Sequence, residues 1–81
     1  MEVLEEEPIK RELMLIKVYN KAENRSDIMT AVDVFRASVI DYSPDGMCIE
    51  VTGSPSKMDA FVKLMQPFGI LEMCRTGIVA L

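Results

Sequence analysis

Hydrophobic residues along this chain follow a strand-like pattern in four stretches and a helical pattern in two others. The strand-like stretches cover residues 12–19, 37–42, 47–52 and 68–81. Between them, apolar residues recur at the spacing i, i+3, i+4, i+7 of an amphipathic helix. These helical stripes are Ile28, Ala31, Val32 and Phe35, and then Met58, Phe61, Val62 and Met65. The pattern predicts the element order β-α-β-β-α-β.

Polar residues between the stretches predict where the elements begin and end. After the first strand comes a polar turn, in which Asn24 or Ser26 is expected to cap the first helix. Residues 43–46, Ser-Pro-Asp-Gly, have the composition of a β-turn. Ser54 followed by Pro55 is a typical start for the second helix.

The element order predicts an α+β fold of the ferredoxin-like, split β-α-β type. Right-handed crossovers place both helices on one face of a four-stranded antiparallel sheet. The other face has no helix to cover it. The residues of the first strand that point to this face are Leu13, Leu15, Lys17 and Tyr19, and only Lys17 among them is polar. In the last strand, Leu71 and Met73 are expected to share a face with Val79 and Leu81, opposite Ile70, Ile78 and Ala80. An apolar face of this kind usually marks an interface, so we expect a homodimer or higher oligomer, paired edge to edge or face to face.

The net charge of −4 comes entirely from the first seven residues, which carry four glutamates, whereas the remainder has nine basic and nine acidic residues. We expect residues 1–8 to be an acidic lead-in or linker remnant and residues 9–81 to form one domain.

The absence of a basic stripe argues against binding to nucleic acid. No apolar run approaches the roughly 18–20 residues of a membrane span, and no leader is visible, so we expect a cytoplasmic protein without membrane contact.

The residues that carry catalysis and metal binding are sparse. The chain has no histidine, so neither a Ser-His pair nor a Cys-His pair is available. Cys48 and Cys74 form no CxxC motif, and each lies in an apolar run, which favours buried free thiols over a disulfide or a zinc site. We expect no catalytic residue, no metal and no cofactor.

Three polar features admit two interpretations each. Arg36 suits the negative end of the first helix or a contact with a partner. Thr52 and Gly53 form a tight strand-to-helix turn, whose N–H groups could also receive an anion. The triplet Arg75-Thr76-Gly77 (residues 75–77) interrupts an apolar strand, as either ordinary sheet or a bulge beside an interface. The interface candidates are Leu13, Leu15, Lys17, Arg36, Arg75, Thr76 and Gly77.

Several short motifs, in this order, resemble the C-terminal domain of the small, regulatory subunit of acetolactate (acetohydroxyacid) synthase. They are Arg11-Glu12-Leu13, Leu15-Ile16-Lys17-Val18, Phe35-Arg36-Ala37, Ile40-Asp41, Glu50-Val51-Thr52-Gly53, Lys57-Met58-Asp59-Ala60-Phe61 and Arg75-Thr76-Gly77-Ile78-Val79-Ala80-Leu81. The resemblance runs from about Pro8 to Leu81. It implies an ACT-like, ferredoxin-like domain and a regulatory, non-catalytic subunit of an enzyme of branched-chain amino acid biosynthesis.

The resemblance further implies a catalytic, thiamine-diphosphate-dependent large subunit as partner, and feedback regulation by valine or a related amino acid. In the family, the effector site lies in an N-terminal ACT domain that has no counterpart in these residues. Valine binding is therefore not transferred to them. Subunit assembly, or passing the effector signal to the catalytic subunit, is the function expected of this domain, whether it is an excised domain or a stand-alone protein.

Two other classes of function are compatible with the fold. An acylphosphatase would need a glycine-rich anion loop after the first strand, and this chain has Asn20, Asn24 and Arg25 there without the glycines. A stand-alone ACT-like sensor of a small molecule such as an amino acid would bind its ligand between the turn at residues 20–24 and a neighbouring copy. Asn20, Asn24 and Arg25 are therefore the possible ligand residues.

Overall fold

The computed structural model of the protein describes residues 10–76 and 79–80. Its elements follow the order expected from the sequence, and the ferredoxin-like α+β fold is confirmed. They are β1 (Lys10–Tyr19), α1 (Ala22–Val34), β2 (Ser38–Tyr42), β3 (Gly46–Gly53), α2 (Pro55–Met65), the 3-10 helix η1 (Gln66–Phe68), β4 (Ile70–Arg75) and β5 (Val79–Ala80).

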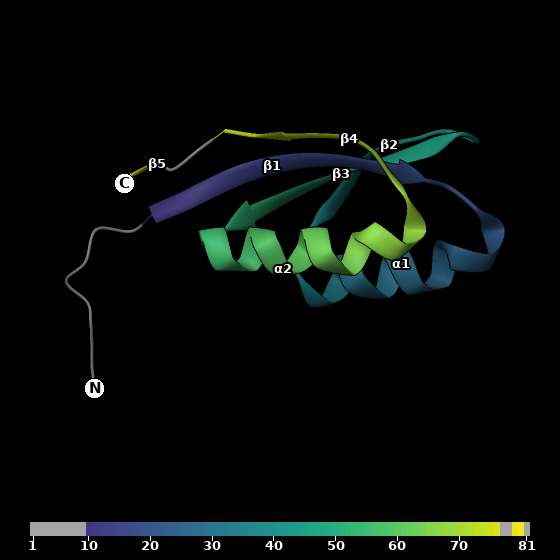
Figure 1. Ribbon diagram of the computed structural model, residues 1–81, viewed down its shortest axis with the longest axis horizontal. Helices are drawn as coiled ribbons and strands as arrows, with labels where there is room; N and C mark the ends of the chain where they lie inside the picture. The colour runs from purple at the N-terminus through teal and green to yellow at the C-terminus, as the bar shows by residue number, and fades with distance from the viewer. Residues whose placement is uncertain (1–9, 77–78, 81) are drawn as a thin grey trace.

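The strands form one antiparallel sheet in the order β2-β3-β1-β4, and β5 pairs with the beginning of β1. Figure 1 shows α1 and α2 side by side on one face of this sheet, with no helix on the other face. This arrangement follows from two right-handed crossovers. α1 connects β1 to β2 and α2 connects β3 to β4, and in each case one strand lies between the two connected strands in the sheet. The sheet therefore has a face covered by helices and an open face.

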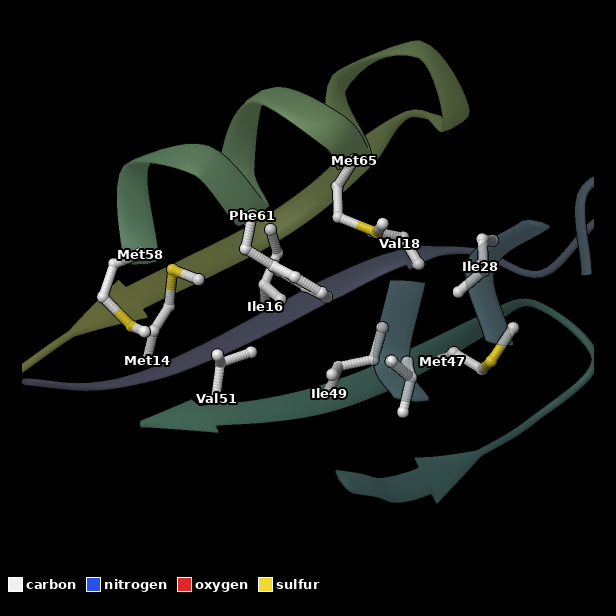
Figure 2. Close-up of a cluster of buried hydrophobic side chains, with 11 residues drawn as sticks. Met14, Ile16, Val18, Ile28, Met47, Ile49, Val51, Met58, Phe61 and Met65 are labelled. Atoms are coloured by element: carbon white, nitrogen blue, oxygen red, sulfur yellow. The ribbon is translucent and has the colours of Figure 1, made fainter. Parts of the chain in front are cut away.

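The hydrophobic core lies between the helices and the covered face. Alternate residues of the two central strands point into it, and Figure 2 shows them meeting side chains of α2. Phe61 is fully buried and packs edge to face against Phe35, with ring centroids 5.1 Å apart. Each such buried side chain contributes roughly 1.5–3 kcal/mol by leaving water. The buried core residues are Met14, Ile16, Val18, Ile28, Val32, Met47, Ile49, Val51, Met58, Phe61 and Met65.

The turn before β3 and the start of α2 agree with the sequence prediction, whereas the last strand, expected over residues 68–81, begins only at Ile70, after η1, and β4 ends at Arg75. The Ser43 N–H donates to the Gly46 carbonyl at 2.9 Å and the Gly46 N–H donates to the Ser43 hydroxyl at 3.2 Å, so the two ends of the expected β-turn are bonded to each other. β3 ends at Gly53, and the Ser54 hydroxyl accepts a hydrogen bond from the Lys57 N–H at 3.3 Å. Because Ser54 satisfies this otherwise unpaired N–H group, the predicted cap of α2 is confirmed.

The predicted start of the first helix is wrong. α1 begins at Ala22, Lys21 is its N-cap residue, and no side chain caps it. Asn24 and Ser26 therefore lie inside the helix and do not precede it. The residues that start it, Ala22 and Glu23, favour a helix on their own, since alanine has the highest helix propensity and a carboxylate suits the first turn.

A second correction concerns β4. The pairing of β1 with β4 shifts by one residue between Lys17 and Val18. Because of this irregularity Met73 lies directly opposite Ile16, on the covered face, whereas Leu71 lies near Lys17 on the open face. The prediction that Leu71 and Met73 share a face is therefore wrong. Val79 and Ala80 have described backbone only, and Ile78 and Leu81 lie outside the described residues.

Candidate functional site: the open face of the sheet

The open face is the side of the sheet that turns away from α1 and α2 (Figure 1). Directly paired residues of an antiparallel ladder project on the same side, so the register defines its members. Three interface candidates, Leu13, Leu15 and Lys17, lie together in the middle of it. The full set is Leu13, Leu15, Lys17 and Tyr19 of β1, Ser38 and Asp41 of β2, Cys48, Glu50 and Thr52 of β3, and Leu71, Glu72 and Cys74 of β4.

Apolar side chains on this face are in contact with solvent. Tyr19 is 44% exposed and Leu71 is 38% exposed, and Leu13 and Leu15 are only half-buried. A shallow hollow of about 180 Å³ lies over the centre of the sheet. It is lined by Leu15, Lys17, Cys48, Glu72 and Cys74 of the open face, together with Met73, which is 47% exposed on the edge strand β4. This combination of a shallow hollow and exposed apolar groups is typical of an association surface and not of a closed ligand pocket.

Charged groups of both signs cross the same face. Lys17 lies opposite Glu72 of β4, and the neighbouring Leu15 lies opposite Glu50 of β3. Within the described residues, Lys17 forms no ion pair with either glutamate, and all ion pairs found there belong to Arg75. The open face thus presents one cation and two nearby carboxylates, none of which has an ionic partner among the described residues.

Both cysteines lie on the open face and both are free thiols. Cys48 is half-buried on β3 and Cys74 is exposed on β4, with β1 between the two strands. Two strand spacings amount to about 9–10 Å, whereas bridged cysteines need Cα atoms within about 7 Å. The free-thiol prediction is confirmed, but the prediction that both are buried is wrong for Cys74, because β4 is an edge strand whose open face has no cover.

Arg75 joins three elements at one end of the sheet. Its Nε and Nη2 groups donate to Glu12 Oε1 at 2.9 and 2.7 Å, and its Nη1 donates to Asp59 Oδ1 at 2.8 Å. The hydrogen bonds to Asp59 and to Glu12 raise the pKa of the Arg75 guanidinium. Glu12 is buried, so its carboxylate is compensated by this pair. The guanidinium that was expected beside an interface is thus bonded within the chain, tying β4 to β1 and α2.

The residue after Arg75 continues the pairing with β1. The Thr76 N–H donates to the Leu13 carbonyl at 3.0 Å, and the Leu13 N–H donates to the Thr76 hydroxyl at 3.2 Å. The hydroxyl replaces a backbone acceptor, so the ladder between β1 and β4 extends one position beyond Arg75. Gly77 lies outside the described residues, and the expectation of a bulge at the triplet remains a prediction.

Arg36 closes the C-terminus of α1 in a conformation that usually requires glycine. Its φ angle is +55°, in the left-handed region. The Arg36 N–H donates to the Asp33 carbonyl at 3.1 Å, and the Ala37 N–H donates to the Val32 carbonyl at 2.8 Å. This pair of bonds is the Schellman motif, in which Arg36 occupies the position where glycine is preferred. The side chain is exposed, and a partner contact for it remains a prediction.

The possible ligand turn after β1 is held by bonds within the chain. Asn20 is buried, its amide N–H donates to the Ser43 carbonyl at 2.7 Å, and its amide oxygen accepts from Arg25 Nε at 2.8 Å. The Arg25 guanidinium also lies 5.9 Å from the Tyr42 ring centroid. Asn20 therefore fastens β1 to the β-turn after β2, while Asn24 lies in α1. Whether a ligand binds at this turn remains a prediction.

The described part of the chain contains no group of three or more Cys, Asp or Glu side chains able to hold a metal ion. Two further hollows lie on the helical side: one of about 390 Å³ beside Asp59 and Lys63, and an apolar one of about 280 Å³ beside Val34 and Leu64. Over residues 10–76 and 79–80, no helix has both the length and the apolar composition of a membrane span.

Comparison with known proteins assigns the chain to a family. The family model described as "Small subunit of acetolactate synthase" matches residues 11–81. This chain belongs to that family. The resemblance found in the sequence motifs is thereby confirmed over nearly the whole domain.

Individual members of the family are similar over most of this chain. The acetolactate synthase small subunit of Mycobacterium bovis is 44% identical over 77 residues, which are 95% of this chain and 46% of that protein. The small subunit of Aquifex aeolicus is 47% identical over 74 residues, which are 90% of this chain and 38% of that protein. The crystal structure of the small subunit from Thermotoga maritima matches 90% of this chain and 45% of that chain, with a TM-score of 0.83 and 42% identity. This chain therefore spans less than half the length of these relatives.

Sequence reasoning missed the two carboxylates that hold Arg75. Glu12 lies near the start of an apolar strand, and Asp59 lies on an exposed part of α2. From the sequence alone, each carboxylate is expected to be in contact with solvent. The signal that could have found them is positional: an arginine in the last strand of this fold faces the start of the first strand, where Glu12 is the charged residue of opposite sign. Ser43, whose carbonyl accepts from Asn20, carries no such signal because the bond uses backbone atoms.

Proposed function

We propose that this domain is a non-catalytic part of the regulatory subunit of acetolactate synthase. It assembles with the catalytic subunit and transmits feedback regulation to it. Membership of the small-subunit family is the observation that carries this proposal. The open face supports it, because exposed apolar side chains next to charges of both signs are what an assembly domain offers to another chain.

The proposal extends to the domain boundaries, the partners and the location. Residues 9–81 form the assembly domain, and residues 1–8 are an acidic lead-in or linker remnant. The domain pairs with at least one further copy of itself and with the catalytic, large subunit. The assembly works in the cytoplasm, where the chain has no membrane contact.

Reconstitution tests the proposed function. The catalytic subunit encoded in the same genome is purified alone and mixed with increasing amounts of this chain, and acetolactate formation from pyruvate is measured. We expect a rate that rises and saturates with the chain, together with co-elution of the two proteins in gel filtration. An unchanged rate without co-elution would refute the proposal.

A second experiment distinguishes the assembly function from that of an ACT-like sensor. Valine, leucine and isoleucine are added to the chain alone, and the melting temperature is followed. The assembly function predicts no shift, since the effector site is not assigned to these residues. A saturable rise in melting temperature with one amino acid would favour the sensor, because a ligand that binds only the folded state stabilises it.

A further inference from the structure

We infer that a second copy of this chain covers the open face, sheet against sheet, and that Lys17 of each copy pairs with carboxylates of the other. The inference rests on the self-association included in the proposed function and adds its geometry. Two arrangements were compatible with the sequence: pairing of strand edges into one continuous sheet, or packing of two open faces. The edges, the charges and the area of the sheet all favour the second.

Both edges of the sheet are poorly suited to extending it. β2 has five residues and shifts its pairing with β3 between Val39 and Asp41. β4 has six residues and shifts its pairing with β1 between Lys17 and Val18. Short, irregular edge strands twist away from a straight ladder, and they are a common means of preventing edge-to-edge pairing.

The charges on the open face complement a second copy of the same face. Lys17 lies near the centre, and Glu50 and Glu72 flank it on the neighbouring strands without forming an ion pair to it. When two such faces meet about a twofold axis, every contact occurs twice, so each lysine can approach a glutamate of the other copy. The apolar residues Leu13 and Leu15, which precede Lys17 on β1, then bury each other beside these charge pairs.

The area of the face is compatible with a reversible dimer. Four strands spaced about 4.8 Å apart and a strand of eight residues give a flat area of about 500 Å². A stable interface buries about 800 Å² of accessible surface on each partner, and accessible surface exceeds flat area because side chains make it rough. The open face is therefore large enough for a dimer, though not for a permanent one.

Alkylation of the two native thiols tests this geometry directly. Cys48 and Cys74 both lie on the open face, on either side of β1. The full chain is treated with N-ethylmaleimide at protein concentrations from well below to about a hundred times the dimer dissociation constant, measured separately by light scattering. Modification is followed by mass spectrometry. At the highest concentration both thiols should react about tenfold more slowly, as mass action leaves under a tenth of the chains monomeric.

A cysteine on the helical side provides the control for reactivity. Ala60→Cys introduces a thiol on the exposed side of α2, away from the sheet. Its rate should not depend on protein concentration. If all three thiols slow together, aggregation and not face-to-face packing is the cause, and the inference is wrong.

A charge reversal tests the lysine. Lys17→Glu leaves only carboxylates among the charged groups of the open face, so the dimer dissociation constant should rise at least tenfold. Lys63→Glu makes the same change in net charge on the exposed side of α2 and should leave the constant unchanged. Equal effects of the two substitutions would point to total charge and would overturn the proposed pairing of Lys17.

The outcomes separate the geometry from the proposed function. If the chain dimerises while Cys48 stays fully reactive, the copies pair through another surface; the geometry fails and self-association stands. If the chain stays monomeric and both thiols become protected only when the catalytic subunit is added, the open face serves that subunit. That result also overturns the inference, yet it supports the proposed assembly function.

Discussion

Replacing Arg36 with glycine should stabilise this domain, although it removes a large side chain. Arg36 has a φ angle of +55° at the C-terminus of α1, where the Schellman bonds of Arg36 and Ala37 fix the backbone. A left-handed conformation brings Cβ close to the following carbonyl oxygen, and glycine has no Cβ. The side chain of Arg36 is exposed and has no bonded partner in the described residues, so little packing is lost.

The size of the gain follows from two opposing terms. The left-handed conformation costs a non-glycine residue roughly 1–2 kcal/mol. Glycine gives back roughly 0.4–1 kcal/mol, because it makes the unfolded chain more flexible. The net stabilisation is therefore about 0.5–1 kcal/mol, which for a domain of this size corresponds to a rise in melting temperature of about 2–8 °C.

Thermal and urea unfolding of the wild-type chain, Arg36→Gly and Arg36→Ala measure this effect. Arg36→Ala removes the same side chain but keeps Cβ, so it should show no gain. Equal stability of the glycine and alanine variants would refute the strain argument. Binding to the catalytic subunit is measured in parallel. If Arg36 contacts that partner, the Arg36→Gly variant will be more stable than the wild-type chain and yet bind more weakly. Strained residues that serve a function lower stability in this way.

Three further substitutions test the fold and the bonds beside the open face. Phe61→Ala, at a fully buried position, should lose about 3–5 kcal/mol in urea unfolding, because it leaves a cavity between α2 and the sheet. Gly69→Ala should lose about 1–3 kcal/mol, since φ is +94° and the new Cβ would lie 2.5 Å from Cδ2 of Tyr19. Arg75→Lys keeps the charge but cannot make both bonds to Glu12, so amide hydrogen exchange at the end of β4 should become faster.

Matched changes serve as controls for these three. Leu64→Ala alters α2 at a position that is 47% exposed, so it should cost much less than Phe61→Ala. The effect of Arg75 should not depend on pH across the neutral and alkaline range. Its pKa is raised in the folded chain, so its contribution is complete below its ordinary value and is lost only above the raised one. A loss of stability near neutral pH that disappears in Arg75→Lys would contradict this assignment.

The sequence was sufficient for the order of the elements because the periodicity of apolar residues reflects burial directly. The stripe ending in Met65 and the alternation around Ile49 both depend on one buried face, and both are confirmed. The cap at Ser54 was also predictable, since a capping bond is made between residues three apart in the chain.

The features of the fold and of the site that the sequence did not predict depend mostly on contacts between distant segments of the chain. A one-residue shift against β1 turned Met73 to the covered face, and strict alternation along β4 cannot reveal such a shift. The start of α1 was misplaced because the helix begins at Ala22 without any side-chain cap, so Asn24 and Ser26 were wrongly interpreted as capping residues. The carboxylates that hold Arg75 lie 63 and 16 positions away in the chain, beyond the reach of local pattern.

The central claim is the proposed function, in which this domain assembles with the catalytic subunit of acetolactate synthase. The most direct test is a titration of the purified catalytic subunit with the chain, with the mass of the complex measured by light scattering. The account predicts a saturable complex that contains both proteins. A catalytic subunit whose mass is unchanged at saturating amounts of the wild-type chain would contradict it.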